Sequence, residues 1–241
     1  MTAALEIEDV SKVFRLFRER PSSLKQRVLS GRMRVEEFWA LRDIAFDVQE
    51  GSSLGLIGHN GSGKTTLLKC IAGILRPTSG VIRYRGRVAA LLELGAGFHP
   101  ELTGAENIAL YASVLGITRR ELAARYDEIV EFAAMSDFLD TPLKYYSSGM
   151  EARLAFSVSV CLQPDILLLD EVLAVGDQAF RERCLHRLRA YHDRGGTLIL
   201  VSHELDQVRA LCQRGIWLER GEVVRDGPID EVLAAYRAKP R

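Results

Sequence analysis

Short runs of apolar residues, separated by stretches of helical periodicity, predict an α/β fold for this chain. The run at 166–169 (ILLL) has no polar position, which is typical of a central parallel strand covered on both faces. The runs at 53–57 (SLGLI) and 197–201 (TLILV) predict two further strands of the same core. Residues 66–75 (TLLKCIAGIL) predict a helix with one apolar face.

Two other regions follow different patterns. Apolar residues recur at helical spacing from about residue 101, which predicts a helical subdomain at about 101–162. The stretches 5–10 and 44–48 predict antiparallel edge strands on either side of an insertion at 15–39. A short β-rich stretch at 81–94 is also predicted.

The C-terminal part predicts a hairpin of 215–219 and 222–225, with a tight turn at Arg220 and Gly221, and then a helix at 229–236. A length of 241 residues is within the range of one large α/β domain with a helical insertion. We therefore predict a single domain over 1–241, with a mixed sheet core, an antiparallel β subdomain and an α-helical subdomain.

Composition excludes only a few classes of protein. The formal net charge is zero, so composition does not indicate a nucleic-acid binder. Four widely spaced cysteines without a C-x-x-C pair predict reduced thiols of a cytosolic protein. The first residues lack the pattern of a signal peptide, and no run approaches the roughly 18–20 apolar residues of a membrane helix.

The segment 58–65 (GHNGSGKT) fits the phosphate-loop pattern G-x-x-x-x-G-K-[ST], and it lies between a predicted strand and a predicted helix, as that motif requires. Its glycines let backbone N–H groups point at phosphate oxygens, and the helix N-terminus adds partial positive charge. Lys64 is a point charge for the β- and γ-phosphates, and the Thr65 hydroxyl is a Mg²⁺ ligand. The predicted nucleotide-binding residues here are Gly58, Asn60, Gly61, Ser62, Gly63, Lys64, Thr65 and Thr66.

Two acidic residues follow the strand at 166–169. Asp170 lies at the carboxyl end of that strand, where open α/β sheets bind ligands, and we predict that it holds Mg²⁺. Glu171 points a different way, and a carboxylate there can act as general base or orient the attacking water. His203 follows the strand at 197–201, and this position favours a catalytic role near the γ-phosphate over the structural role more usual for a single histidine.

A second anion site is predicted at Ser147, Ser148 and Gly149, which precede a predicted helix at 150–161. Small residues at a helix start expose backbone N–H groups and a hydroxyl to an anion. Taken alone, such a segment is only a good N-cap. Because the chain already has one phosphate loop, the second site makes sense if it closes on the γ-phosphate held by another copy.

Between the other two motifs, the segment 146–150 (YSSGM) resembles the ABC transporter signature of the LSGGQ type, which it keeps at Ser147 and Gly149. The segments 91–107 (LLELGAGFHPELTGAEN), 146–158 (YSSGMEARLAFSV) and 167–177 (LLLDEVLAVGD) are similar to ATP-binding subunits that export O-antigen, teichoic acid and related cell-surface glycans. The resemblance covers essentially the whole chain.

This resemblance implies a P-loop, ABC-type nucleotide-binding domain that binds ATP and Mg²⁺, hydrolyses ATP and works as a homodimer. It also implies a separate transmembrane permease, a lipid-linked polysaccharide as substrate and a place on the cytoplasmic face of the inner membrane. A motor for a different substrate is one alternative. A soluble ABC ATPase that acts on DNA or ribosomes is another, but the tandem motors, coiled coils and zinc motifs usual in that class are missing from the sequence.

The resemblance also assigns individual residues. Phe14 matches the aromatic residue that stacks on adenine, with Phe17 as the alternative. Glu93 is the best candidate for the position where related motors have a glutamine that contacts Mg²⁺. Asp177 ends the segment 174–177, which matches the loop that contacts the partner across the dimer.

Two further expectations concern the insertion near the N-terminus and the C-terminal end of the chain. Two interpretations of the basic insertion at 15–39 are equally supported. It is either a solvated loop, or a segment that contacts anionic lipid headgroups or a pyrophosphate-linked glycan. Because the chain stops directly after the predicted motor, we expect no C-terminal carbohydrate-binding domain.

Overall fold

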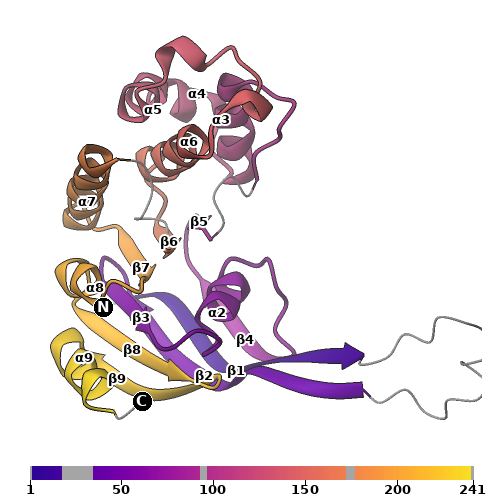
Figure 1. The fold of residues 1–241 in the computed structure, drawn as a ribbon, viewed down its shortest axis with the longest axis vertical. Helices are drawn as coiled ribbons and strands as arrows, with labels where there is room; N and C mark the ends of the chain where they lie inside the picture. Colours follow the sequence, from indigo (N-terminus) through magenta and orange to yellow (C-terminus); the bar gives the residue numbers. More distant parts are fainter. Residues whose placement is uncertain (1, 18–34, 93–96, 172–176, 240–241) are drawn as a thin grey trace, which may run out of the picture.

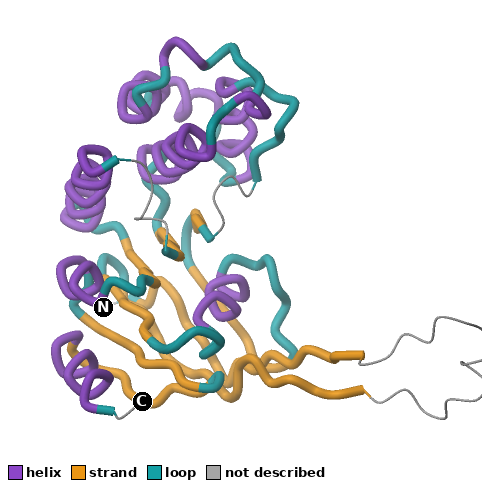
Figure 2. Tube along the Cα trace, in the orientation of Figure 1, coloured by secondary structure: helices purple, strands orange, loops and turns teal. Residues whose placement is uncertain are grey.

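The computed structural model describes residues 2–17, 35–92, 97–171 and 177–239. Figures 1 and 2 show two lobes, a β-rich one that contains both termini and a helical one at the opposite end of the molecule. A long β-hairpin projects from the β-rich lobe. The mixed-sheet core, the antiparallel sheet and the helical subdomain all match the fold class predicted from the sequence.

The core is a six-stranded sheet with the order β5-β6-β7-β3-β8-β9. Strands β5 to β8 pair in parallel and β9 is antiparallel to β8. The bounds are β3 Ser53–Ile57, β5 Val88–Leu91, β6 Ile166–Asp170, β7 Thr197–Val201, β8 Arg214–Glu219 and β9 Glu222–Pro228. Every residue of β3 and β7 is buried, as their apolar runs predicted.

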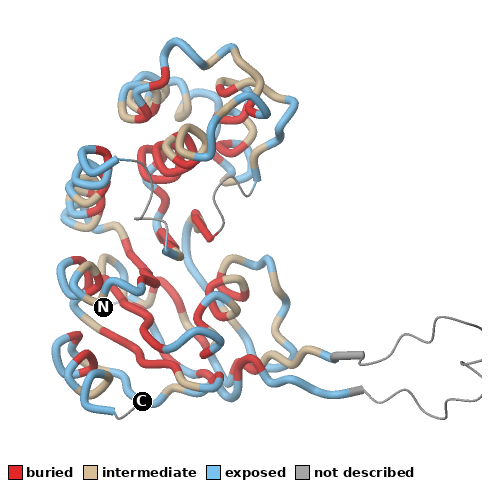
Figure 3. Tube along the Cα trace, in the orientation of Figure 1, coloured by how far each residue is buried: buried red, intermediate tan, exposed pale blue. Residues whose placement is uncertain are grey.

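Each face of this sheet has its own hydrophobic core, because successive side chains of a strand point to opposite faces. Leu167 and Leu169 of β6 pack with α7 (Gln178–Asp193), α8 (Leu205–Leu211) and α9 (Ile229–Ala238). Ile166 and Leu168 pack with α2 (Lys64–Ile71) and the antiparallel sheet. Figure 3 shows the buried strands between these two layers.

The antiparallel sheet has the order β2-β1-β4, formed by β1 (Ala3–Phe17), β2 (Val35–Gln49) and β4 (Ser79–Tyr84). The two strands pair antiparallel, and β2 lies at the edge of the sheet, as predicted for 44–48. The predicted edge position of 5–10 was wrong, because β1 lies in the middle of the sheet, and both strands are longer than predicted, with fifteen residues each. Their pairing continues through exposed charged positions such as Arg15 and Glu37, where no apolar alternation marks a strand. Residues 18–34, which include most of the basic residues of the insertion, lie outside the described part.

The helical lobe contains α3 (Gly104–Val114), α4 (Arg119–Ala123), α5 (Tyr126–Ala133), two short 3-10 helices at Ser136–Phe138 and Leu143–Tyr145, and α6 (Ser148–Cys161). Its core packs around Ile108, Ile129 and Leu154. Thr103 and Glu106 form a capping box at the start of α3. The lobe therefore has a core of its own within the single chain.

Helix α7 joins the two lobes through its arginines. The Arg183 guanidinium donates to the carbonyl of Phe132 at 2.8 Å, at the end of α5. Arg187 forms an ion pair with Glu128 of α5. The orientation of the helical lobe is thus tied to α7 by charged contacts in addition to apolar packing.

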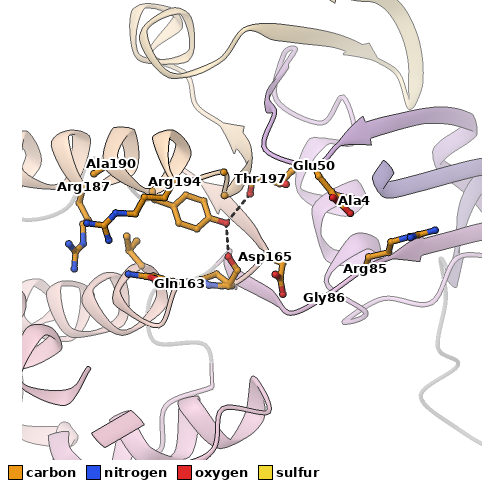
Figure 4. Close-up of a pocket in the computed structure, with 15 residues that line it drawn as sticks. Ala4, Glu50, Arg85, Gly86, Gln163, Asp165, Arg187, Ala190, Arg194 and Thr197 are labelled. Carbon is orange, nitrogen blue, oxygen red and sulfur yellow. Dashed lines mark hydrogen bonds between the residues drawn. The ribbon is translucent and has the colours of Figure 1, made fainter. Parts of the chain in front are cut away.

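A cavity of about 380 Å³ lies at the amino ends of β6 and β7, away from the phosphate loop (Figure 4). Asp165, Arg194 and Thr197 are among the residues that line it. The Tyr191 hydroxyl donates to the carbonyl of Pro164 at 2.9 Å, and burial raises its pKa. None of the residues predicted to bind nucleotide lines this cavity.

Candidate nucleotide-binding site

The phosphate loop connects β3 to α2, as predicted. Lys64 begins α2 and is only 6% exposed. Its ammonium donates to the carbonyls of Gly58 at 2.7 Å and His59 at 3.0 Å, so the loop curls around it. Burial lowers the pKa of Lys64, whereas the nearby carboxylates of Glu171 and Asp170 raise it.

Two glycines of the loop have no room for a side chain. Gly58 has a φ of 150°, and a Cβ there would lie 2.2 Å from the carbonyl oxygen of Leu218. Gly63 has a φ of 106°, and its Cβ would lie 2.6 Å from the carbonyl oxygen of Ala40. These glycines let the loop pack tightly against β8 and β2.

Two of the three residues predicted to hold Mg²⁺, Thr65 and Asp170, lie together at the carboxyl end of β6. The Thr65 hydroxyl donates to Oδ2 of Asp170 at 2.7 Å. The other carboxylate oxygen, Oδ1, is buried and has no hydrogen-bond partner in the described part of the chain. Burial is also the main cause of the raised pKa of Asp170. A hydroxyl and an unpaired buried carboxylate oxygen are suitable oxygen donors for a hard divalent cation.

Glu171 and His203 also meet at this edge. Oε1 of Glu171 lies 2.6 Å from Nε2 of His203, and both side chains are about half exposed. Glu171 has a left-handed φ of 56°, and its N–H donates to the carbonyl of Val201 at 2.9 Å. This conformation is strained for a residue with a side chain, and strain of this kind concentrates at functional sites.

The predicted second anion site lies elsewhere. Ser147 caps α6, and its hydroxyl accepts from the N–H of Met150 at 3.2 Å. Ser148 and Gly149 form the first turn of the same helix. Because α6 is in the helical lobe and α2 is in the β-rich lobe, one chain does not bring the two anion sites together (Figure 1).

Asp177 caps α7, where its carboxylate accepts from the N–H of Phe180 at 2.8 Å. This backbone hydrogen bond is the main cause of its lowered pKa. The carboxylate also forms an ion pair with Arg153 of α6 at 2.6 Å. The signature helix and the start of α7 are therefore connected directly. Glu93 and residues 174–176 lie outside the described part.

The region beside the phosphate loop contains aromatic residues that the sequence did not indicate. A cavity of about 790 Å³ is lined by Gly61, Phe38 and Trp39, with charged residues from the β8–β9 turn. Trp39 is 41% exposed, and the Arg42 guanidinium lies 5.3 Å from its ring centre. Phe14 pairs with Phe38 across the β1–β2 ladder and is not among the residues that line this cavity.

This combination of fold and site defines a P-loop ATPase of the ABC class. The phosphate loop, the acidic pair and the histidine meet at one edge of a mixed sheet, and a signature segment begins a helix in a separate helical lobe. A family profile described as "ABC transporter" matches residues 41–174. The chain belongs to the ABC transporter family, binds ATP and is an ATPase.

Several curated relatives are exporter subunits. The chain is 46% identical to the ABC transporter protein AbcA of Aeromonas salmonicida, over 96% of its own length and 75% of the relative. It is 40% identical to the O-antigen export system ATP-binding protein RfbB of Klebsiella pneumoniae, over 98% of both chains. It is 39% identical to the teichoic acids export ATP-binding protein TagH of Listeria innocua, over 96% of its own length and 69% of the relative.

Solved structures confirm the fold. An ATP-binding subunit of an ABC transporter superposes with a TM-score of 0.79 at 23% identity, over 100% of this chain and 95% of that chain. A dimeric ATP-binding cassette with ADP and phosphate superposes with a TM-score of 0.74 at 21% identity, over 93% and 98%. Among the described residues, no helix has both the length and the apolarity to span a bilayer.

Proposed function

We propose that this chain is the ATP-hydrolysing motor subunit of an exporter that moves a lipid-linked polysaccharide across the cytoplasmic membrane. The observation that carries the proposal is the full-length similarity to an O-antigen export ATP-binding protein. The similarity to a teichoic acid export protein supports the same substrate class. The chain works on the cytoplasmic face with a separate membrane-spanning permease.

In this proposal Glu171 orients and deprotonates the attacking water, and His203 holds the Glu171 carboxylate. The 2.6 Å contact between these two side chains supports their pairing. Lys64 leaves its two carbonyl partners and binds the β- and γ-phosphates of ATP. Burial of Lys64 strengthens its attraction for phosphate, because the surrounding dielectric is low.

Thr65 and Asp170 are the residues that would hold Mg²⁺. The unpaired buried Oδ1 of Asp170 supports this assignment, because a cation would satisfy it. The ion would neutralise charge on the phosphates during transfer. Ser62 contributes a buried hydroxyl that also has no partner among the described residues and is suited to a phosphate oxygen.

Two copies of the chain would form each complete site. Ser147, Ser148 and Gly149 begin α6 in the other lobe, so their N–H groups are suited to a γ-phosphate that a second copy presents. The Asp177–Arg153 ion pair would then connect that contact to α7 and the core. ATP binding closes the dimer and hydrolysis reopens it, and this two-state cycle drives export.

The export proposal is tested by deleting the gene in its host and following the lipid-linked glycan. We expect intact polymer on the cytoplasmic leaflet of the membrane, and we expect the wild-type gene, but not Glu171→Gln, to rescue it. Normal glycan at the cell surface after deletion would contradict the proposed substrate. That result would leave the ATPase assignment intact.

We propose that the adenine base of ATP occupies the cavity beside Gly61, in contact with Trp39. Trp39→Ala should raise the KM for ATP about 3- to 10-fold, which corresponds to one lost aromatic contact. ATP should also quench the tryptophan fluorescence of the wild type, since Trp217 is the only other tryptophan and is buried.

Phe14→Ala is the matched comparison, since family resemblance places the base on Phe14. An unchanged KM in Trp39→Ala, together with a raised KM in Phe14→Ala, would assign the base to β1 and exclude Trp39.

A further inference from the structure

The last helix of the chain reaches the phosphate loop. Tyr236 of α9 lies against His59, the second residue of that loop, with ring centres 5.3 Å apart and planes inclined by 43°. The Tyr236 hydroxyl and Nδ1 of His59 are 3.4 Å apart. This contact is not predictable from sequence patterns, since the two residues are 177 positions apart.

Tyr236 also packs against the core. The ring of Trp217 on β8 meets it edge-on, with centres 5.5 Å apart. Trp217 is buried, and the Lys239 ammonium lies 5.2 Å from its ring centre. Tyr236 therefore contacts both a core strand and the exposed side chain of His59.

The backbone of His59 has a separate role in the loop. Its carbonyl accepts from the Lys64 ammonium at 3.0 Å and from the N–H of Ser62 at 3.1 Å. A side-chain contact that fixes His59 also fixes the direction of this carbonyl. The chain of contacts runs from β8 through Tyr236 and His59 to the lysine that binds phosphate.

A second contact places the end of α9 at the same site. Lys239 forms an ion pair with Glu219, and both residues line the cavity beside Gly61. The end of α9 thus contacts the phosphate loop through Tyr236 and lines the adjacent cavity through Lys239.

We propose that Tyr236 is a positioning residue for ATP binding, acting through His59 to hold the phosphate loop in the shape that receives the nucleotide. Free energy lost from this contact would appear as weaker nucleotide binding, because the contact of Tyr236 with the loop is made through His59 and not through Lys64, Glu171 or His203. The inference rests on ATP binding at this loop and is independent of what is exported.

The test compares Tyr236→Ala, Tyr236→Phe, His59→Ala and the double variant His59→Ala/Tyr236→Ala in the purified chain. The readouts are direct binding of a fluorescent ATP analogue, steady-state KM and kcat, and Tm. We expect each single alanine variant to raise KM about 3- to 10-fold, as for one aromatic contact, with kcat within about twofold of wild type. Tyr236→Phe keeps the ring and should stay close to wild type.

Coupling is measured with the double variant. If His59 and Tyr236 act through their mutual contact, losing both side chains should cost no more than losing one. The double variant should then bind ATP no more weakly than whichever single variant binds it less tightly. Independent, additive losses would overturn the proposal. His59 is exposed, so its substitution tests the contact even where Tyr236→Ala disturbs folding.

Arg209→Ala is the control for a purely structural role of α9. Arg209 of α8 pairs with Asp230 of α9 at 2.7 Å, and no hydrogen bond or ion pair joins it to the phosphate loop within the described part of the chain. We expect this variant to retain the wild-type KM. A Tyr236→Ala variant with a lowered Tm and an unchanged KM would show that Tyr236 only anchors the helix, and would overturn the inference.

Discussion

Glu171→Gln should reduce ATP hydrolysis by at least about a hundredfold while ATP still binds, because the amide keeps the shape of the carboxylate but cannot accept a proton. Glu171 is placed for this role by the end of β6 and by its left-handed backbone, and its carboxylate meets His203 at 2.6 Å. Lys64, Thr65 and Asp170 are untouched by the substitution. Bound ATP should therefore persist, and the closed dimer should accumulate.

Three measurements check this result: phosphate release, equilibrium binding of ATP, and the ATP-dependent shift from monomer to dimer in gel filtration. Glu182→Gln is the matched control, because Glu182 is an exposed residue of α7 whose side chain bonds Gln178. It should hydrolyse ATP at the wild-type rate. Rapid hydrolysis by Glu171→Gln would remove Glu171 from its proposed role.

The core and its motifs were predictable because they depend on local sequence. Fully buried strands such as β3 and β7 are marked by largely apolar runs. The phosphate loop requires glycine at positions 58 and 63, because a Cβ at either position would clash with a backbone carbonyl oxygen. The meeting of Thr65 with Asp170 followed from a general rule, since parallel strands bring their carboxyl ends to one edge of a sheet.

Other elements were missed because their signals are weak or non-local. Helix α7 was not predicted, because it is mostly polar and its buried positions are limited to Phe180, Cys184, Leu188 and Tyr191. The extent of the β1–β2 hairpin was missed because exposed charged residues such as Arg15 and Glu37 interrupt the apolar positions of its outer half, so that no regular alternation marks a strand there. Backbone pairing holds such strands together, and pairing leaves little trace in composition.

The aromatic residues near the phosphate loop illustrate the same limit. Trp39 lies beside Gly61, and Tyr236 lies against His59, only because β2 and α9 pack against the loop in three dimensions. A tryptophan in a strand or a tyrosine in a terminal helix is by itself more typical of ordinary packing. Contacts between such distant positions become visible only when the fold is known.

Mixing two inactive variants should restore ATPase activity, because in the proposed dimer each complete site takes its phosphate loop from one chain and its signature segment from the other. Lys64→Ala removes the buried ammonium to which we assign phosphate binding. Gly149→Asp places a negative charge at the start of α6, where a Cβ has space because its nearest neighbour is Oγ of Ser147 at 3.9 Å. Each variant alone should fold with a wild-type Tm and lack activity.

In a mixed dimer both defects fall on one of the two sites, and the other site keeps a normal loop and a normal signature segment. Half of the dimers in an equal mixture are mixed, so the activity should recover to about a quarter of the wild-type value. The measurement is phosphate release after mixing, with different affinity tags on the two variants to confirm that mixed dimers form. If one chain carried a complete site by itself, confirmed mixed dimers would remain as inactive as their parents, because no chain in the mixture has both motifs intact.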